Sequence, residues 1–380
     1  MVPKGDNIQI RLIVTWNMSS VVVGFLSYVE ATNISYLHFT VAFLVLSLFS
    51  GTIFGFLFCL LLSYSAALLL RAILNKPITV NQTQDAVLVT GASSGIGKDA
   101  ALALAVRGVT VFAGVRKEKD AEALRHIAKT LNVDEGKLIP VILDVTNQEQ
   151  IAQVRALVEK ELVSSNKRLI GLVNNAGYGE SGPVEIISLE KWRYQYEVNL
   201  FGQIAVTQAF LPLLRKAATK SRSSRILMVT SAVGRFTIPS IGAYSSTKYA
   251  LESVSDALRM ELASWNIDVA IIEPGAIETD FMNAAKGKAE ETFKHILEKS
   301  SDDGDEVIKR YQMFREKQAS PVTKGGSVVL SSNKIAKALF DSKPLARYTC
   351  GHDALAVLNI FGFIPSEQKD RMFGSLWKSV

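Results

Sequence analysis

The stretch Val87–Gly97 reads VLVTGASSGIG, and it decides the fold class of this chain. An apolar run of strand length leads into three glycines, and an amphipathic segment of helical length, Lys98–Arg107, follows. Glycines let a backbone approach a pyrophosphate closely, and the N-terminus of the next helix offers free N–H groups and a favourable dipole. The pattern therefore indicates a dinucleotide-binding turn; the alternative is an ordinary tight turn between a strand and a helix.

Strand-like and helix-like segments alternate along the rest of the chain. The strand candidates are 86–89, 110–115, 138–143, 169–174, 225–229 and 268–273. Helical patterns such as 98–107, 148–162 and 248–264 lie between them. This alternation predicts right-handed βαβ units and a parallel sheet covered on both faces. We therefore expect an α/β fold with a doubly wound (Rossmann) sheet over residues 85–380, after a polar linker at 75–84.

The segment before the linker is much more apolar. Residues 39–73 carry no charge until Arg71. About 20 apolar residues are enough to span a bilayer core, so a helix over 39–70 is long enough to cross a membrane. The alternative is a buried core helix, which is disfavoured because soluble helices are not apolar on every face over such a length.

A second uncharged stretch covers residues 12–29, so residues 1–74 are expected to form a membrane anchor of one transmembrane helix or a hairpin of two. Basic residues flank the two stretches on their outer sides, and Glu30 is the charged residue that lies between them. A hairpin would place both basic flanks in the cytosol. In either arrangement we expect the domain at 85–380 to face the cytosol, with the endoplasmic reticulum as the default membrane for a eukaryotic source.

Charge and cysteine content exclude other classes. The net charge is +6, and no basic run is interleaved with aromatic residues, so nucleic-acid binding is not expected. The two cysteines, Cys59 and Cys350, form neither a CxxC motif nor a cluster with histidine. We therefore expect no metal site and no disulfide framework.

The residues after the second strand bear on the choice of cofactor. Domains that bind NAD carry an acidic residue here for the ribose hydroxyls, but this chain has Val115-Arg116-Lys117. Arg116 is placed to meet the 2′-phosphate of NADP, which favours NADP(H) over NAD(H). The alternative is that Arg116 stacks on adenine and does not discriminate.

Tyr244 and Lys248 are four residues apart in a strong helical pattern, so both side chains emerge on one face. A nearby ammonium is expected to lower the pKa of a phenol from its usual value of about 10. Tyr244 is thus a candidate proton donor to a carbonyl or acceptor from an alcohol. Such a pair on a helix surface is common by chance, so companion residues matter. Ser231 follows the strand at 225–229 and can hold a substrate oxygen.

Further motifs follow other strands at the same carboxyl edge. They are Asn174-Asn175-Ala176-Gly177, then Asn199, and Pro274-Gly275-Ala276-Ile277-Glu278-Thr279. Together with TGxxxGIG at 90–97, Asp144, Ser231 and YxxxK at 244–248, they occur in order over about residues 84–350. In these motifs the chain resembles the short-chain dehydrogenase/reductase family.

The resemblance implies four catalytic residues. Tyr244 is the general acid/base, and Lys248 bonds the nicotinamide ribose and tunes Tyr244. Ser231 orients the substrate oxygen, and Asn199 holds a water that relays protons to Lys248. Hydride passes directly between the nicotinamide and the substrate carbon, and no metal is needed.

The resemblance also implies the cofactor contacts. The phosphate loop contributes Gly91, Ser93, Ser94, Gly95, Ile96 and Gly97. Asp144 and Val145 meet adenine. The nicotinamide side is lined by Asn175, Ala176, Gly177, Pro274, Gly275, Ile277 and Thr279. In this family the Tyr/Lys helix and its predecessor often pack into oligomers, so a homodimer is a further expectation.

Finer features resemble the family branch that acts on lipidic alcohols and ketones, which includes retinol, 17β-hydroxysteroid and 3-hydroxybutyrate dehydrogenases. These features are VxxNLFGxxxVTQAFLPLLR at 198–215, a charged insertion at 286–321 and an Arg347-Tyr348 strand. A membrane anchor suits a substrate that partitions into lipid, although the long apolar N-terminal region departs from the single short anchor usual in that branch. The insertion is either a substrate lid or a solvated surface segment. The apolar run at 355–364 is a core segment, a docking segment for a partner, or a membrane contact.

Three functions are therefore compared. An active oxidoreductase with a hydrophobic substrate is favoured, and a reductase of a soluble substrate is its rival among enzymes. A non-catalytic NADP(H)-binding membrane scaffold or sensor is disfavoured by the intact tetrad. A transporter is disfavoured by the large α/β domain.

Overall fold

The computed structural model describes residues 84–277, 326–351 and 364–378, and the single positions 62, 65, 279, 281, 287, 306, 309, 310, 313, 354, 355 and 358. The chain divides into two units, Met1–Lys76 and Pro77–Val380. The expected membrane segments at 12–29 and 39–70, the linker and the insertion at 286–321 lie outside the described residues, apart from isolated positions. Within the part of the chain that is described, no helix is both long and apolar enough to cross a bilayer.

Seven parallel strands form one sheet in the order β3-β2-β1-β4-β5-β6-β7. Their bounds are β1 Asp85–Val89, β2 Thr110–Val115, β3 Leu138–Ile142, β4 Arg168–Asn174, β5 Ser224–Val229, β6 Ile267–Pro274 and β7 Arg347–Cys350. The direction of winding reverses between β1 and β4, and ligands bind at such a switch point in open α/β sheets. The expected doubly wound parallel sheet is confirmed.

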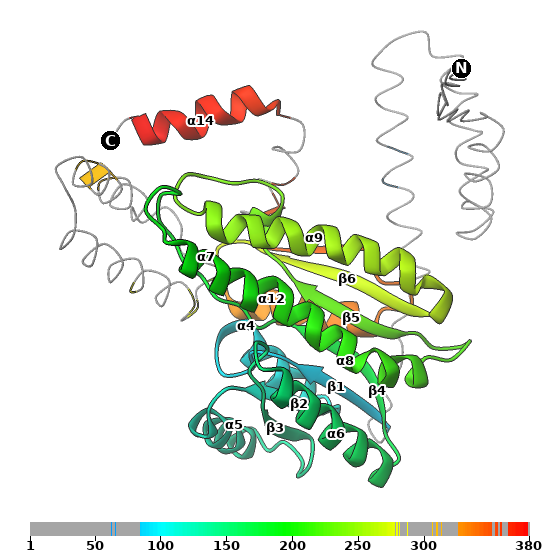
Figure 1. Ribbon diagram of the computed structural model, residues 1–380. Helices are drawn as coiled ribbons and strands as arrows, with labels where there is room; N and C mark the ends of the chain where they lie inside the picture. The colour runs from blue at the N-terminus through cyan, green and yellow to red at the C-terminus, as the bar shows by residue number, and fades with distance from the viewer. Residues whose placement is uncertain are drawn as a thin grey trace, which may run out of the picture. The chain divides into compact units, whose positions relative to one another are not determined.

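Helices cover both faces of this sheet (Figure 1). Among the described residues, the α-helices with known bounds are α4 Gly95–Val106, α5 Glu118–Thr130, α6 Gln148–Ser164, α7 Leu189–Tyr196, α8 Gly202–Ala217, α9 Gly242–Leu262, α12 Val328–Phe340 and α14 Ser366–Lys378. A π-helical turn, η1 (Glu197–Phe201), joins α7 to α8. Short 3-10 turns follow β5 (η2, Ala232–Gly234) and α9 (η3, Ala263–Trp265).

The apolar core has two layers, one on each side of the sheet. Along β1, Val87 and Val89 belong to the layer that contains residues of α4 and α12, whereas Ala86 and Leu88 belong to the layer with α6 and α8. Successive side chains of a strand point to opposite faces, so a strand that is apolar at every position must be covered twice. This double burial fixes the sheet as the scaffold for the loops at its carboxyl edge.

Two helices begin earlier than the sequence predicts. The helix expected at 98–107 starts at Gly95, and the one expected at 248–264 starts at Gly242. Glycine and serine have low helix propensity, so they obscure starts that are stabilised by packing. Tyr244 and Lys248 both lie within α9, as their helical pattern predicts.

Candidate active site

The backbone of the glycine loop packs directly against the backbone that follows β4. Gly91 has φ +65°, and a Cβ atom at this position would lie 2.7 Å from Cα of Ala176. A Cβ atom on Gly97 would overlap the side-chain nitrogen of Asn175 and the backbone oxygen of Gly91. Only glycine fits these two places, and together they leave an open cradle at the start of α4.

Asn175 and Thr90 hold this loop in place. Nδ2 of Asn175 donates to the backbone oxygens of Thr90 at 3.0 Å and Gly91 at 3.2 Å. The Thr90 hydroxyl oxygen accepts from the backbone N–H groups of Asn175 and Ala176, both at 3.0 Å. The sequence reading assigned Asn175 to the nicotinamide side, whereas the structure directs its side chain to the glycine loop.

The loop after β6 reaches the same cradle. Gly95 has φ +55°, and a Cβ atom there would lie 3.2 Å from Cγ2 of Thr279. Ser93 and Ser94 are half-buried beside it, and the Ile96 side chain packs against the core. The glycine loop and the loop after Pro274 therefore meet near the switch point, which is the candidate position for a dinucleotide.

Three residues end the neighbouring strands. Arg116 follows β2 and is exposed. Oδ1 of Asp144, after β3, accepts from the Thr146 backbone N–H at 2.9 Å and from its hydroxyl at 2.7 Å. Val145 is buried in the core, and a Cβ atom on Gly202 would lie 2.8 Å from its Cγ2. Of the three, Arg116 is the side chain that is open to a charged ligand.

The proposed catalytic side chains converge at the carboxyl ends of β5 and β6. Nζ of Lys248 lies 5.6 Å from the centre of the Tyr244 ring and donates to the backbone oxygen of Val229 at 3.0 Å. The Ser231 hydroxyl donates to the backbone oxygen of Pro274 at 3.3 Å. Ser231 thus links β5 to the loop that starts at Pro274.

Burial dominates the titration of these groups. Burial raises the pKa of Tyr244 above its ordinary value, and a hydrogen bond with the Ser231 side chain acts in the opposite direction. Burial lowers the pKa of Lys248 to about 8, and the Glu252 carboxylate opposes this shift. The pKa of Tyr244 is therefore raised and not lowered as the sequence predicts, because burial removes hydration from the phenol. Tyr244 stays protonated at neutral pH, which suits a proton donor.

Asn199 is fully buried in the π-helical turn. Its Oδ1 accepts from the Tyr178 backbone N–H at 2.7 Å, and its Nδ2 donates to the Tyr178 oxygen at 2.8 Å and to the Thr247 hydroxyl at 3.1 Å. The amide is thus engaged with its neighbours.

The segments expected to line the nicotinamide side are held in place by contacts with neighbouring segments. The Gly275 N–H donates to the oxygen of Cys350 at 2.9 Å, and Ile277 is buried and forms a β-bridge with Gly326. The oxygen of Ala176 accepts from the Gln203 side chain. A Cβ atom on Gly177 would lie 3.7 Å from Oδ1 of Asn199.

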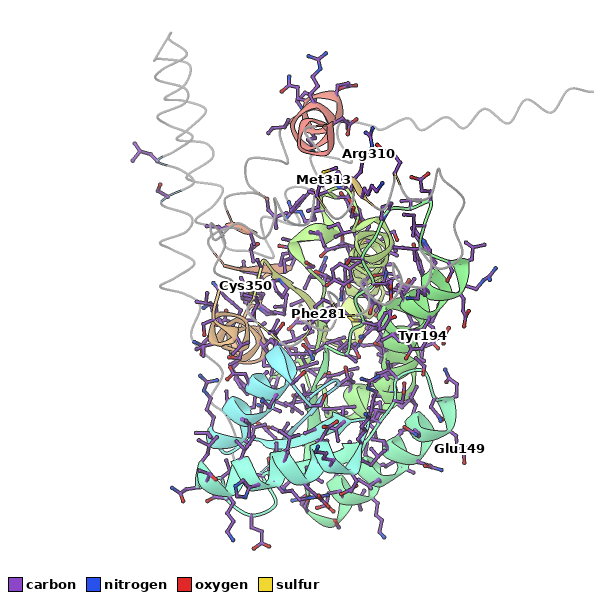
Figure 2. The ribbon with its side chains drawn as sticks, turned by 90° about the vertical axis from the view of Figure 1, so that its left-hand side faces the viewer. Glu149, Tyr194, Phe281, Arg310, Met313 and Cys350 are labelled. Atoms are coloured by element: carbon purple, nitrogen blue, oxygen red, sulfur yellow. The ribbon has the colours of Figure 1, made fainter. Side chains whose placement is uncertain are left out.

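One residue beside Tyr244 is missing from the sequence-based site. The ring of Phe281 packs on that of Tyr244, with centroids 5.6 Å apart and the planes tilted by 51°. Phe281 lies near the centre of the domain (Figure 2). Its only sequence signal is an aromatic side chain two residues after Thr279.

Comparisons with known proteins agree with this geometry. A family model described as short chain dehydrogenase matches residues 85–290. The NADPH-dependent 3-dehydrocapnine reductase of Ornithobacterium rhinotracheale is 32% identical over 75% of this chain and 95% of that protein. The 17-beta-hydroxysteroid dehydrogenase type 6 of Bos taurus is 35% identical over 81% of this chain and 94% of that protein. A solved short-chain dehydrogenase of Streptomyces avermitilis matches with a TM-score of 0.58 and 26% identity, covering 79% of this chain and 98% of that one.

Proposed function

Since the chain belongs to the short-chain dehydrogenase/reductase family and is an oxidoreductase acting on CH–OH and C=O groups, we propose that it interconverts a hydrophobic alcohol and its carbonyl compound with NADP(H) at a membrane. The observation that carries this proposal is the convergence of Ser231, Tyr244 and Lys248 beside the glycine loop.

The residues of the chain divide the chemistry as follows. NADP(H), when bound, supplies or accepts the hydride. Tyr244 gives its phenolic proton to the carbonyl oxygen in reduction and takes the hydroxyl proton in oxidation. The Ser231 hydroxyl forms a hydrogen bond with that oxygen. The positive charge of the Lys248 ammonium stabilises the Tyr244 phenolate that is left after the proton transfer.

The cofactor preference rests on Arg116. This exposed cation follows β2, where the ribose of a bound dinucleotide lies, and no acidic residue stands at 115–117. A guanidinium binds phosphate through charge-assisted hydrogen bonds, so a 2′-phosphate gains a partner here. The name of the reductase from Ornithobacterium rhinotracheale, which includes NADPH, also supports NADP(H).

The apolar surroundings of the site support a hydrophobic substrate. Phe281 packs on Tyr244, and Ala232, next to Ser231, forms a buried cluster with Ala354 and Leu358. The second half of the C-terminal apolar run, residues 359–363, lies outside the described residues. Apolar walls favour a retinoid, a steroid or another lipid-like compound over a small polar one.

The proposed location follows from the first 74 residues. Their apolar stretches would anchor the chain in a bilayer and leave the catalytic domain in the cytosol, at the endoplasmic reticulum in a eukaryote. A substrate that dissolves in the same bilayer would then be concentrated near the enzyme. We also propose a homodimer through α8 and α9, because Tyr249 and Met260 of α9 are exposed.

The proposal is tested with the full chain in detergent. NADPH and NADH are titrated first, and turnover is then measured on matched retinoid, steroid and short-chain carbonyl compounds. We expect tighter binding of NADPH and turnover of a lipid class. Preferred turnover of the short-chain compounds would overturn the substrate class, and cofactor binding without any turnover would favour the scaffold or sensor.

A membrane fractionation experiment tests the anchor separately. The full chain is expected to sediment with membranes and to resist extraction by salt or alkali. A chain lacking residues 1–74 is expected to lose that behaviour while it keeps cofactor binding. Equal extraction of both chains would contradict the anchor.

A further inference from the structure

Glu252 shares a helix face with the catalytic pair. It lies four residues after Lys248 in α9, as Lys248 lies four residues after Tyr244, so the three side chains emerge along one side of the helix. Only 8% of the Glu252 side chain is exposed. A buried carboxylate is costly unless it is paired, so its partners indicate why it is there.

Glu252 and Lys248 together hold the end of β5. Nζ of Lys248 donates to the oxygen of Val229, and the Thr230 hydroxyl donates to Oε1 of Glu252 at 2.7 Å. Successive side chains of the helix face thus bind successive residues of the strand, just before Ser231. The position of Ser231 relative to α9 therefore depends on both.

A glycine allows this close approach. A Cβ atom on Gly234, in the turn that follows Ser231, would lie 3.2 Å from both Cγ of Glu252 and the oxygen of Lys248. The turn therefore rests directly on the helix at these two residues. Ser231 is held from one side by the Thr230–Glu252 bond and from the other by this packing.

Arg347 of β7 completes the arrangement. Its Nε donates to Oε2 of Glu252 at 3.0 Å, and its Nη2 donates to Asp256 at 2.6 Å. The same Nε lies 3.8 Å from Glu273, which also accepts from Arg235 at 3.2 Å and from Thr349 at 2.8 Å. Since Glu273 directly precedes Pro274, this network connects α9, the Ser231 turn and the Pro274 loop.

The charge of Glu252 also acts on Lys248. Burial lowers the pKa of the Lys248 ammonium to about 8, and the Glu252 carboxylate raises it against that effect. The charged or titratable groups around the pair come from α9, the turn after β5, β6 and β7: Tyr244, Tyr249, Asp256, Arg235, Glu273 and Arg347. Burial raises the pKa of Glu252, and its bonds with Thr230 and Arg347 oppose this rise. Arg235 pairs with Glu273.

We propose that Glu252 is a positioning residue of the active site, which acts as counter-charge to Lys248 and ties the Ser231 strand end to the catalytic helix. The proposal rests on the proposed function of Tyr244, Lys248 and Ser231. Glu252 acts through Thr230, which directly precedes Ser231, and through its charge near Lys248, and Arg347 holds its carboxylate in place.

The experiment compares Glu252→Gln with Asp256→Asn in the full chain. The second variant is a matched control, because it removes a carboxylate from the same arginine and the same helix. Glu252→Asp is the conservative variant that keeps the charge. Thermal unfolding and NADPH affinity are measured first, to establish that each variant is folded. The pH profile of kcat/KM for carbonyl reduction is then recorded.

We expect the alkaline limb of the Glu252→Gln profile to move to lower pH by about one unit, the size of shift typical of a lost nearby charge. Asp256→Asn is expected to keep the wild-type limb, and Glu252→Asp to return most of the shift. A wild-type limb in folded Glu252→Gln, or an equal displacement in all three variants, would overturn the proposal. If Glu252→Gln does not fold, the folded Glu252→Asp chain decides, because a full one-unit shift there is incompatible with the proposal.

A second readout does not depend on turnover. The chain is labelled with 13C at the lysine ε-carbons, and the Lys248 signal is identified as the one absent from Lys248→Arg. Its titration midpoint is expected to fall by about one pH unit in Glu252→Gln and to stay in place in Asp256→Asn. If the wild-type chain turned over none of the carbonyl compounds, the proposed function would fail, and this titration would still decide the role of Glu252.

Discussion

The ammonium nitrogen of Lys248 lies 5.6 Å from the centre of the Tyr244 ring. The same nitrogen is fixed by its bond to the oxygen of Val229. The lysine therefore meets the face of the phenol ring while its position is set by the sheet. The site thus contains two separate groups, the phenolic proton of Tyr244 and the positive charge of Lys248. Each can be removed by one substitution.

Tyr244→Phe removes the hydroxyl and keeps the ring against Phe281. We expect kcat to fall by roughly 10²–10⁴-fold, the usual contribution of a positioned acid or base. Cofactor affinity should stay close to wild type, since the ring still fills its place. Turnover assays and fluorescence titration with NADPH check both parts. Turnover near the wild-type rate would rule out Tyr244 as the proton donor.

Lys248→Met tests the buried ammonium through stability. The pKa of Lys248 is lowered from 10.5 to about 8 in the folded chain. Between these values the unfolded state binds more protons, so wild-type stability rises with pH across this window. The variant lacks this titration. We therefore expect its melting temperature, relative to wild type, to be highest near pH 7 and to decline towards pH 10.

The raised pKa of Tyr244 has the opposite sign and acts only above pH 10, where the folded state retains a proton that the unfolded state loses. Measurements between pH 7 and 10 keep the two effects apart. A difference in melting temperature that does not change over this range would contradict the lowered pKa of Lys248.

Arg116→Asp tests the reading of the 2′-phosphate. The substitution replaces a cation that attracts the phosphate with an anion that repels it, so we expect the preference for NADPH over NADH to fall by at least about tenfold, or about 1.4 kcal/mol. Lys129→Asp, at the far end of α5 and also exposed, makes the same change of charge away from the site. Equal ratios of kcat/KM in the two variants would show that Arg116 does not distinguish the cofactors.

Gly97→Ala tests the packing of the glycine loop. The added methyl group would overlap the Asn175 side chain and the Gly91 backbone, so we expect a loss of about 1–3 kcal/mol in stability and weaker cofactor binding. Gly374→Ala is the control, because Gly374 is also helical and has no neighbour within 4 Å of an added Cβ. That change should stabilise α14 by about 0.5–1 kcal/mol. Equal melting temperatures would contradict the tight contact at Gly97.

The sequence predicts the sheet well because strands buried on both faces are continuous apolar runs. The expected strands at 86–89 and 225–229 each differ from β1 and β5 by one residue. The first residue of α9 is harder to predict, because it is Gly242, which has low helix propensity. The π-helical turn at Asn199 also has no local sequence signal.

The sequence predicts those site residues that follow the end of a strand. It does not predict contacts that depend on which strands are neighbours in the sheet. Tyr244, Lys248 and Ser231 follow from helical spacing and from one strand end. The bond between Glu252 and Arg347 joins residues 95 positions apart. It forms because β7 pairs with β6 in the sheet, and no local sequence pattern predicts which strands are neighbours. The direction of the Tyr244 pKa shift likewise needs the degree of burial, which spacing does not give.

After β6 the chain leaves the sheet, and the residues at the two ends of the excursion pair with each other. Ile277 and Gly326 form a bridge, and the Gly326 N–H donates to the oxygen of Ala276 at 2.7 Å. Because the two ends of segment 278–325 are already joined, the entropy of closing it changes by only about 0.6 kcal/mol for each doubling of its length. Insertions and deletions in this segment are therefore expected to change the stability of β6 and α12 little.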